Sequence, residues 1–461
     1  MLSDMNNNFP SKVSIIGAAR SGLAAASFFV ERGSKVFVSD NCTEQKLMAS
    51  LETKGLSGLE HESGGHTDRV LDCEVLILSP GVPSKLPIIK LAQKAGIPVW
   101  SEMELGYQMS KATFLAVTGS TGKSTTASLA GEALKAAGKE SAVAGNIGIP
   151  VISIVPSLSA EGYVVAEVSS FQLENIDCFR PKAAVILNLM KNHLDRYLSE
   201  DDYYNAKKQI ARNFNKDNYL ILNAKDPKLM AWSKEMVHKT NIIFFGENIT
   251  GYDSFWCEQD KLCYRFEGST GNILNFSDMS IKGRHNHENA CAASALAKVV
   301  GIDDKLIKEG ICSFKGLPHR LEFIQSIDGV SWYNDSKSTT AESVAVAVAA
   351  FPKGVHLIAG GKDKGCDFAA VKNTIAASVK DIILIGEAAE RIEKQWKDLA
   401  PVYRCKTLKD AVDMAALKSE PGDYVVFSPG CSSFDMFSSY EERGAIFRQL
   451  VMELGNERVG L

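Results

Sequence analysis

The sequence predicts an α/β protein of three domains, each organised around a sheet of mainly parallel strands. Short apolar runs alternate with helix patterns from Lys12 to Phe427, which is typical of doubly wound sheets. The length of 461 residues exceeds what one domain usually holds, and a hydrophobic content of 45% suffices for several cores. Breaks near Lys111 and before Pro318 divide the chain into expected domains 1–111, 112–314 and 315–461.

Composition and charge exclude several classes of protein. The net charge is −4 and no long basic run occurs, so we expect no nucleic-acid partner. No apolar stretch is long enough to span a membrane, and residues 1–12 lack the basic and apolar regions of a signal peptide. Ten cysteines are scattered without a C-x-x-C pair, which is typical of reduced thiols. We therefore expect a cytoplasmic monomer that acts on small molecules and not on a membrane.

The first residues form a βαβ pattern. Lys12–Gly17 is a strand, Arg20–Arg32 is a helix, and Lys35–Ser39 is a second strand that ends at Asp40. The turn between strand and helix, GAARSG, resembles the dinucleotide fingerprint G-x-G-x-x-G. However, Ala19 stands where the second glycine would let the backbone approach a pyrophosphate. We therefore predict a Rossmann-like domain that binds a phosphate-bearing ligand other than a nicotinamide cofactor.

Polar residues after the strands mark the ligand side of this domain. Val75–Leu78 and Pro98–Trp100 are further strands, and Ser79 follows the first of them. Gly17, Asp40 and Ser79 therefore fall at the carboxyl ends of parallel strands, where such sheets bind ligands. Asp40 either contacts a ribose or uracil group or only caps its strand, and the sequence leaves both open.

A phosphate-binding loop organises the middle of the chain. Phe114–Val117 is a short apolar strand, Thr118–Gly122 is a loop of small residues, and a helix pattern runs from Ser124 to Gly138. Backbone N–H groups and the helix dipole make such a turn an anion site. Lys123 can reach terminal phosphates, and Ser124 or Thr125 can hold Mg²⁺. The loop is shorter than G-x-x-x-x-G-K-[ST] because its first glycine is Gly119. We predict a nucleoside triphosphate site over an ordinary turn.

Two later strands lead to candidate metal ligands. Tyr163–Glu167 ends in a carboxylate, and Ala183–Leu187 leads to His193. A carboxylate one strand away from a phosphate-binding loop is where a Mg²⁺ ligand is expected. The alternatives are a surface glutamate and a structural histidine. A helix that begins at Tyr203 carries Lys207 and Lys208, a pair that normally lies on a solvated face.

Several motifs together resemble those of the Mur ligase family. These are TGSTGKSTT, GNIGIP, EVSSFQLE, NHLDRY and YYNAK. The resemblance spans almost the whole chain, and SSFQLE is most similar to the member that adds D-glutamate to UDP-N-acetylmuramoyl-L-alanine. It implies an ATP- and Mg²⁺-dependent ligase of peptidoglycan precursor synthesis that works through an acyl phosphate. It also implies that Lys207 is the family's carbamylated lysine, a role that the residues alone do not indicate.

The resemblance continues into the last third of the chain. Asn286 and Asn289 lie three residues apart at the start of a helix pattern and match the family motif for the adenine edge, although Asn286 could also cap the helix. His319 and Arg320 match the family's HR pair, in which the arginine reaches the ATP phosphates. Asp335 matches the ribose ligand. Strands are expected at 330–334, 355–359, 382–385 and 424–427.

The residues and the resemblance together define the expected sites. The catalytic residues are Lys123, His193, Lys207 and Arg320. The ATP site comprises Gly119, Ser120, Thr121, Gly122, Lys123, Ser124, Thr125, Asn286, Asn289, His319, Arg320 and Asp335. The nucleotide-sugar site comprises Arg20, Ser21, Asp40, Asn41, Ser79, Pro80, Gly81, Asn146 and His193. The D-glutamate site comprises Lys337, Thr339, Lys364, Ser433, Phe434 and Tyr440, and the metal site Ser124, Glu167, His193 and Lys207.

Three other functions fit parts of the sequence. A different amino-acid ligase of the Mur or folylpolyglutamate synthase type would share the phosphate-binding loop but usually not SSFQLE. A nicotinamide oxidoreductase would use the GAARSG turn but would not need that loop. A non-enzymatic ATP-binding regulator would have no reason to keep Lys207, His193 and Lys364 in matching places.

Overall fold

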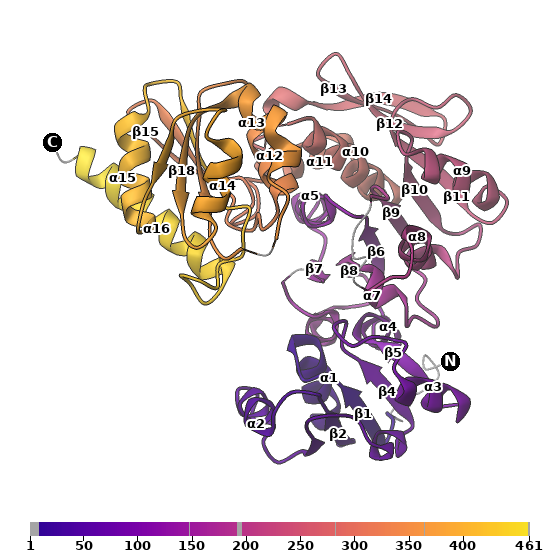
Figure 1. Ribbon diagram of the computed structural model, residues 1–461. Helices are drawn as coiled ribbons and strands as arrows, with labels where there is room; N and C mark the ends of the chain where they lie inside the picture. The colour runs from indigo at the N-terminus through magenta and orange to yellow at the C-terminus, as the bar shows by residue number, and fades with distance from the viewer. Residues whose placement is uncertain (1–8, 147, 191–195, 282, 364, 460–461) are drawn as a thin grey trace. The chain divides into compact units, whose positions relative to one another are not determined.

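The computed structural model describes residues 9–146, 148–190, 196–281, 283–363 and 365–459. It contains three sheets and divides into two compact units (Figure 1). The first unit comprises the chain up to Met279 together with Arg284–Phe314, and the second comprises Lys315 onward with the short segment 280–283. None of the described helices combines the length and the hydropathy that a membrane crossing requires.

The first sheet is five-stranded, parallel throughout, with the order β3-β2-β1-β4-β5. This order matches the first five strands of the dinucleotide-binding order 3-2-1-4-5-6, so the expected Rossmann-like domain is present. Ile15 packs in a cluster with α1, whereas its neighbour Ile16 packs in another with α3. Both faces of the sheet are therefore covered. The elements are β1 (Lys12–Ile16), α1 (Arg20–Val30), β2 (Lys35–Ser39), α2 (Glu44–Glu52), β3 (Glu60–Glu62), β4 (Val75–Leu78), α3 (Pro87–Lys94), β5 (Val99–Ser101) and α4 (Glu102–Gln108).

The second sheet has nine strands and also belongs to the first unit. Its order is β14-β13-β12-β11-β10-β9-β6-β8-β7, parallel from β7 to β12 and antiparallel from β12 to β14. The strands are β6 (Thr113–Thr118), β7 (Ser141–Gly145), β8 (Tyr163–Glu167), β9 (Ala183–Ile186), β10 (Tyr219–Asn223), β11 (Asn241–Gly246), β12 (Asp253–Glu258), β13 (Lys261–Phe266) and β14 (Ser269–Asn275). The helices are α5 (Lys123–Ala136), α6 (Val151–Ile154), α7 (Ser170–Leu173), α8 (Glu200–Lys208), α9 (Pro227–Met236), α10 (Arg284–Val299) and α11 (Asp304–Ser313).

The third sheet forms the second unit. Its order is β15-β16-β20-β17-β18-β19, with only the β15–β16 pair antiparallel among the described strands. The four strands expected from the sequence are confirmed. The elements are β15 (Glu322–Ile327), β16 (Val330–Asn334), α12 (Ala341–Val348), β17 (Val355–Gly360), α13 (Lys372–Ser378), β18 (Val379–Ile385), α14 (Ala389–Trp396), β19 (Val402–Arg404), α15 (Leu408–Lys418), β20 (Tyr424–Phe427) and α16 (Tyr440–Val459).

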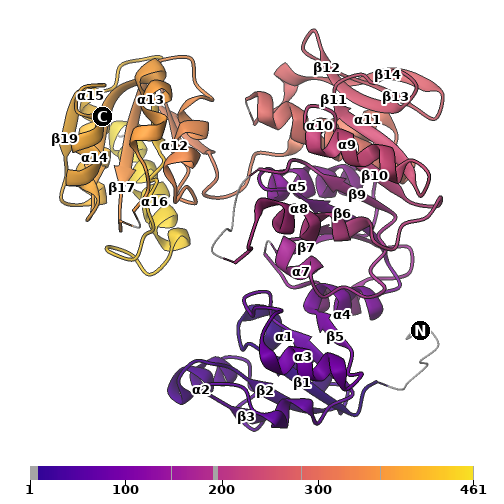
Figure 2. The same cartoon turned by 45° about the vertical axis from the view of Figure 1, so that its right-hand side comes forward.

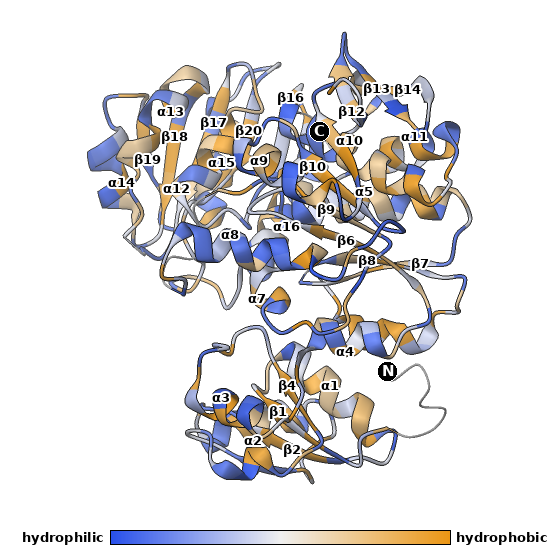
Figure 3. Ribbon diagram, turned by 90° about the vertical axis from the view of Figure 1, so that its right-hand side faces the viewer, coloured by the Kyte–Doolittle hydropathy of each residue, from blue (hydrophilic) through white to orange (hydrophobic). Residues whose placement is uncertain are grey.

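The sheets explain where functional side chains gather. Strand β6 pairs with β8 on one side and β9 on the other, so the residues that follow these three strands share one edge of the sheet. Figure 2 shows β6 beside α5 in the first unit. Much of the hydrophobic colouring in Figure 3 falls on the sheet strands. This agrees with the burial of every residue of β17 and of every residue of β6 after Thr113. The loops that follow β6, β8 and β9 therefore lie together at the carboxyl edge of the sheet.

Candidate functional site

The loop between β6 and α5 needs glycine at two positions. Gly119 has a φ of +151° and Gly122 a φ of +82°, a backbone conformation that other residues rarely adopt. A Cβ built on Gly119 would lie 2.9 Å from the Cβ of Leu187, and one on Gly122 would lie 2.6 Å from the Oδ1 of Asn289. Gly122 directly precedes the first residue of α5. The loop is therefore a tight turn onto a helix N-terminus, which is the arrangement that binds phosphate.

Asn188 holds this loop from the neighbouring strand. Its Oδ1 accepts hydrogen bonds from the backbone N–H groups of Ser120 and Thr121, each at 3.0 Å. Its Nδ2 donates to the Thr121 carbonyl at 3.3 Å. Sequence reasoning missed this residue. The available signal was a polar side chain at the end of β9, at the same edge as the phosphate-binding loop.

Lys207 lies beside the same loop. It is 2% exposed, its Nζ donates to the Gly119 carbonyl at 2.9 Å, and its ammonium lies 4.5 Å from the centre of the Tyr203 ring. Burial, followed by repulsion from Lys123, lowers the pKa of Lys207 to about 6, while the charge of Glu167 opposes the shift. The alternative of a solvated lysine is wrong for this residue. At neutral pH its amine is mainly neutral and is therefore a nucleophile.

Glu167 ends β8 with a buried carboxylate. It is 2% exposed, and its Oε1 accepts a hydrogen bond from the Nδ2 of Asn146 at 2.8 Å. Its Oε2 is buried and has no hydrogen-bond partner within the described residues. Because buried acceptors are normally satisfied, this oxygen fits a hard cation such as Mg²⁺. The alternative of a surface glutamate is therefore wrong.

Other expected metal ligands are only partly described. Ser124 and Thr125 are both buried, in the first turn of α5. In the described ranges no group of three or more His, Cys, Asp or Glu side chains could hold a metal ion. His193 lies outside the described residues. The described candidate set is thus a carboxylate, hydroxyl groups and the amine of Lys207.

Asn286 and Asn289 face each other within the first turns of α10. The Nδ2 of Asn289 donates to the Oδ1 of Asn286 at 3.1 Å, and the Oδ1 of Asn289 accepts from the Oγ1 of Thr126 at 3.2 Å. Asn289 thus connects α10 to α5 beneath Gly122. Since α10 begins at Arg284, Asn286 lies inside the helix and does not cap it. The pair lies next to the phosphate-binding loop.

In the first domain, Asp40 fixes two turns. Its Oδ2 accepts from the Ala18 N–H at 2.6 Å and its Oδ1 from the Cys42 N–H at 2.9 Å. Burial alone would raise the pKa of the Asp40 carboxyl, but these two hydrogen bonds outweigh it and lower the pKa. The capping role that the sequence allowed is therefore present. Ser79 is buried and donates its hydroxyl to the Gly17 carbonyl at 2.7 Å.

The remaining nucleotide-sugar candidates line the same strand ends with more solvent access. Arg20 is the first residue of α1 and is exposed. The others are exposed or half-buried and comprise Ser21, Asn41, Pro80 and Gly81. The structure therefore brings the β1–α1 turn, the end of β2 and the loop after β4 together at one edge, as the sequence predicts.

In the second unit, Asp335 follows β16 and is buried. Its Oδ1 accepts from the Leu321 N–H at 3.1 Å and its Oδ2 from the Ser428 hydroxyl at 2.8 Å. Burial raises the pKa of Asp335 to about 7. His319 has a φ of +61°, and its carbonyl accepts from the Lys337 N–H at 3.0 Å. Arg320 is half-buried.

The amino-acid candidates gather after β16 and β20. The Nζ of Lys337 lies 5.6 Å from the centre of the Tyr440 ring, and Ser433 is 2% exposed. Thr339 is half-buried, whereas the Phe434 side chain is 63% exposed. Lys364 lies outside the described residues. Two strand ends of one sheet thus carry the described members of this group.

The chain matches known sequence families over nearly its whole length. Residues 11–101 match the MurD-like N-terminal domain of Mur ligases, residues 117–297 the Mur ligase middle domain, and residues 319–431 the glutamate ligase domain of Mur ligases. The chain belongs to the Mur ligase family. Its three matched domains agree with the three sheets and with the fold predicted from the sequence.

Named enzymes match this Mur ligase over almost its full length. The UDP-N-acetylmuramoylalanine--D-glutamate ligase of Geotalea daltonii is 41% identical over 96% of this chain and 97% of its own. The enzyme of the same name from Koribacter versatilis is 37% identical over 97% and 98%. Among solved structures, the MurC of Thermotoga maritima (TM-score 0.59, 18% identity, 96% and 99% covered) and a MurF of Acinetobacter baumannii (TM-score 0.60, 17% identity, 95% and 93% covered) share the fold.

Proposed function

We propose that this Mur ligase joins D-glutamate to UDP-N-acetylmuramoyl-L-alanine with hydrolysis of ATP, in peptidoglycan precursor synthesis. The observation that carries the proposal is the similarity over at least 96% of the chain to relatives with that name. The same relatives favour D-glutamate over the substrates of other Mur or folylpolyglutamate synthase-type ligases. The structure supports it with a phosphate-binding turn, a buried carboxylate and a buried amine at one sheet edge.

The chemistry explains why a phosphate-binding loop is needed. A carboxylate and an amine do not form an amide in water, because the carboxylate has no good leaving group. In the proposed reaction the carboxylate of the L-alanyl group attacks the γ-phosphorus of ATP, which releases ADP and gives an acyl phosphate. The amine of D-glutamate then attacks the acyl carbon, loses a proton and expels phosphate. Catalysis of the first step rests mostly on positioning and charge neutralisation.

Residues of the first unit would neutralise that charge. Lys123 and the backbone N–H groups in the first turn of α5 would hold phosphate oxygens. Glu167 and Ser124, with carbamylated Lys207 and His193, would hold Mg²⁺, which supplies further neutralisation of the phosphates when bound.

Lys207 has the properties that carbamylation requires. A neutral amine attacks CO₂, forms an N–C bond and releases one proton. The lowered pKa of Lys207 makes its amine available near neutral pH. The product carries a negative charge in place of a positive one, which suits a metal ligand beside Glu167.

We also propose roles for residues of the second unit. We propose that Arg320 and His319 contact the ATP phosphates, that Asp335 contacts the ribose, and that Lys337, Thr339, Lys364, Ser433, Phe434 and Tyr440 form the D-glutamate site. Asn286 and Asn289 of the first unit would contact the adenine edge. Residues Arg20, Ser21, Asp40, Asn41, Ser79, Pro80, Gly81 and Asn146, with His193, would form the nucleotide-sugar site.

We further propose that the enzyme works in the cytoplasm as a monomer. The ten cysteines are all free in the structure, as expected where thiols stay reduced. Its substrates would be ATP, a nucleotide sugar and an amino acid, without nucleic acid or membrane.

The deciding measurement is phosphate release from ATP with UDP-N-acetylmuramoyl-L-alanine while the amino acid is varied. Release with D-glutamate and not with L-glutamate supports both the reaction and its stereochemistry. Release only with another amino acid or another nucleotide would support the same ligase mechanism with a different substrate. If the protein binds ATP but releases no phosphate in any combination, the result would instead support a non-enzymatic ATP-binding regulator.

A further inference from the structure

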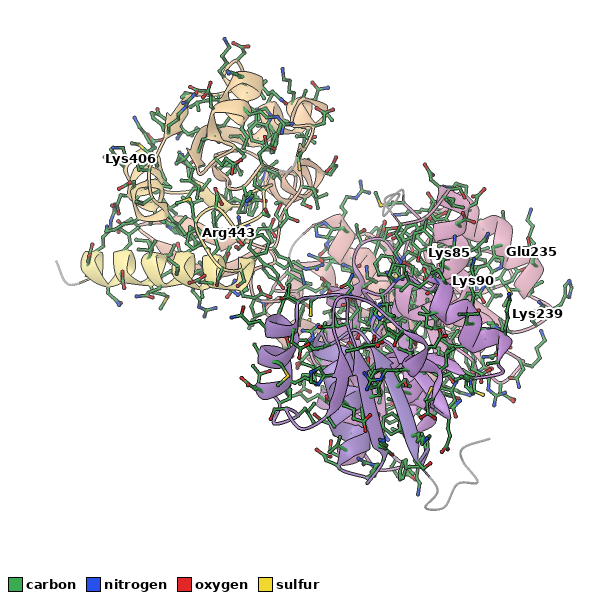
Figure 4. All side chains as sticks on the ribbon, turned by 60° about the horizontal axis from the view of Figure 1, so that its bottom comes forward. Lys85, Lys90, Glu235, Lys239, Lys406 and Arg443 are labelled. Carbon is green, nitrogen blue, oxygen red and sulfur yellow. The ribbon has the colours of Figure 1, made fainter. Side chains whose placement is uncertain are left out.

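Arg443 is a buried arginine near the start of α16. It is 1% exposed, and Figure 4 labels it near the beginning of the long terminal helix. Its Nε donates to the hydroxyl of Ser336 at 3.0 Å and its Nη2 to the Ser336 carbonyl at 2.7 Å. Its Nη1 donates to the Cys431 carbonyl at 3.1 Å. Because Ser336 follows β16 and Cys431 follows β20, one guanidinium fastens two loops.

The same guanidinium borders a third loop, which follows β17. A Cβ built on Gly361 would lie 3.2 Å from the Nη1 of Arg443 and 2.5 Å from the carbonyl oxygen of Ser432. The N–H of Lys362 donates to that Ser432 carbonyl at 2.9 Å. Strands β16, β20 and β17 are neighbours in the sheet. Arg443 therefore lies where three carboxyl ends meet, the edge at which such sheets bind ligands.

Two hydroxyl groups in these loops indicate that a polar ligand reaches this edge. Ser338 is 4% exposed and Ser432 is 3% exposed. The Oγ atom of each is buried and makes no hydrogen bond to any described residue. Buried hydroxyl groups are normally paired. A ligand with polar atoms would satisfy them.

The charge of Arg443 is held only by neutral oxygens. Its hydrogen bonds within the described residues end on one hydroxyl and two carbonyl groups. Burial lowers the pKa of Arg443 to about 10, against the opposing effect of Cys431 and of the acids Asp435 and Asp335. It therefore remains cationic at neutral pH. A buried cation whose hydrogen bonds end on neutral oxygens is unfavourable, and an anionic ligand at this edge would offset that cost.

We propose that Arg443 is a positioning residue that fixes the shape of the amino-acid pocket and makes the pocket favourable for an acidic amino acid. The inference rests on the proposed function. Lys337 and Thr339 lie in the loop that Ser336 begins, and Ser433 lies in the loop after β20. Loss of the guanidinium frees these loops from each other without removing any side chain proposed to touch the substrate.

The test measures ATP-dependent phosphate release by Arg443→Met, Arg443→Lys and Ser336→Ala. We expect the KM for D-glutamate to rise about tenfold or more in Arg443→Met, with a change of less than about twofold in the KM for ATP. Arg443→Lys keeps the charge, and Ser336→Ala removes the hydroxyl that accepts from Arg443 and donates to the Tyr440 carbonyl. Both should show smaller rises in the same KM. Arg458→Met, on the exposed end of the same helix, is the matched control and should match the wild type.

Two results would overturn the inference. One is a KM for D-glutamate that is unchanged in Arg443→Met. The other is a parallel loss of kcat and of both affinities, which a merely structural role would produce. If Arg443→Met does not fold, the lysine and Ser336→Ala variants decide by the same criterion. A wild type that releases no phosphate with D-glutamate would contradict the proposed function instead, and that result is obtained before any variant is made.

Discussion

Lys123 and Lys207 donate hydrogen bonds to the same oxygen, the carbonyl of Gly119, at 3.0 and 2.9 Å. The two amines come from different helices and repel each other when both are charged. Lys207 is buried, and burial followed by repulsion from Lys123 lowers its pKa to about 6. The phosphate-binding loop is therefore flanked by two lysines, and one of them, Lys207, is mainly a neutral amine near pH 7.

This relationship predicts that Lys207 reduces stability while it serves activity. In CO₂-depleted buffer at pH 7, we expect Lys207→Met to raise the free energy of unfolding by about 1–3 kcal/mol. The reason is that the unfolded amine gains a proton that the folded amine does not hold. With CO₂ present, the same variant should lose activity by about a hundredfold or more, because it cannot form the carbamate proposed to help hold Mg²⁺. Urea unfolding and phosphate release measure the two effects.

The lowered pKa of Lys207 also predicts how the difference in unfolding free energy between the wild type and Lys207→Met changes with pH. Between the folded pKa of about 6 and the unfolded value of 10.5, the unfolded state binds more protons, so the stability of the wild type rises with pH relative to the variant. The difference between the two proteins should therefore shrink from pH 7 to pH 9. Lys208→Met changes the neighbouring lysine, which is half-buried, and should show neither effect. A constant difference across this range would contradict the lowered pKa.

Glu174 predicts a second effect, on the nucleotide-sugar site. Its carboxylate accepts hydrogen bonds from the hydroxyls of Tyr197 and Ser84, both at 2.5 Å, and from Arg196 at 3.1 Å. Arg196 also donates to the Pro80 carbonyl at 2.8 Å. Glu174, directly and through Arg196, thus connects loops of the second sheet to the loop that follows β4.

We expect Glu174→Ala to raise the KM for UDP-N-acetylmuramoyl-L-alanine by about tenfold, with a smaller effect on the KM for ATP. Glu174→Gln keeps one acceptor oxygen and should lie between wild type and alanine. Steady-state kinetics with each substrate varied in turn measures this. Glu132→Gln, at a half-buried position of α5 outside the proposed sites, serves as the control. Equal rises in both KM values would mean that Glu174 acts on general stability and not on the loop after β4.

Asn188 predicts an electrostatic effect on ATP binding. Its Oδ1 accepts hydrogen bonds from two backbone N–H groups of the phosphate-binding loop. Asn188→Asp keeps the shape but places a negative charge there, so we expect the Kd for ATP to rise about tenfold or more and to become dependent on salt. Asn188→Ala removes the contact without charge and should weaken binding less. Calorimetric titration at two ionic strengths would refute the idea if the aspartate and alanine variants bound ATP equally.

Local patterns predicted a large part of the fold and of this site. The phosphate-binding loop, Glu167 and the strand ends of the first sheet follow from apolar runs and from glycine, which report on local backbone geometry. The special role of Lys207 came only through family resemblance, because two adjacent lysines on a helix look alike in sequence. Its burial depends on how α8 lies beside the loop that follows β6, a tertiary contact.

The residues that sequence reasoning missed act across long separations. Asn188, Glu174 and Arg443 each contact loops 22 to 107 positions away. No local period places such partners together, and a buried arginine such as Arg443 reads as a surface residue in a helix pattern. The strands from β10 to β14 were also not predicted. The antiparallel strands are joined by short turns at Gln259–Asp260 and Glu267–Gly268, whose residues have positive φ values, and only the second turn contains a glycine.

A last prediction separates backbone strain from contact in the phosphate-binding loop. Gly122 and Gly138 flank α5, and both have positive φ values, +82° and +66°. A Cβ on Gly138 meets nothing within 4 Å, whereas one on Gly122 lies 2.6 Å from the Oδ1 of Asn289. We expect Gly138→Ala to cost about 1 kcal/mol of unfolding free energy from strain alone. Gly122→Ala should cost about 2–3 kcal/mol and also weaken ATP binding, because it displaces Asn289. Urea unfolding and ATP titration of both variants measure the difference. Equal losses of unfolding free energy in the two variants would show that Asn289 moves aside at no energetic cost. The glycine at position 122 would then be needed only for its positive φ.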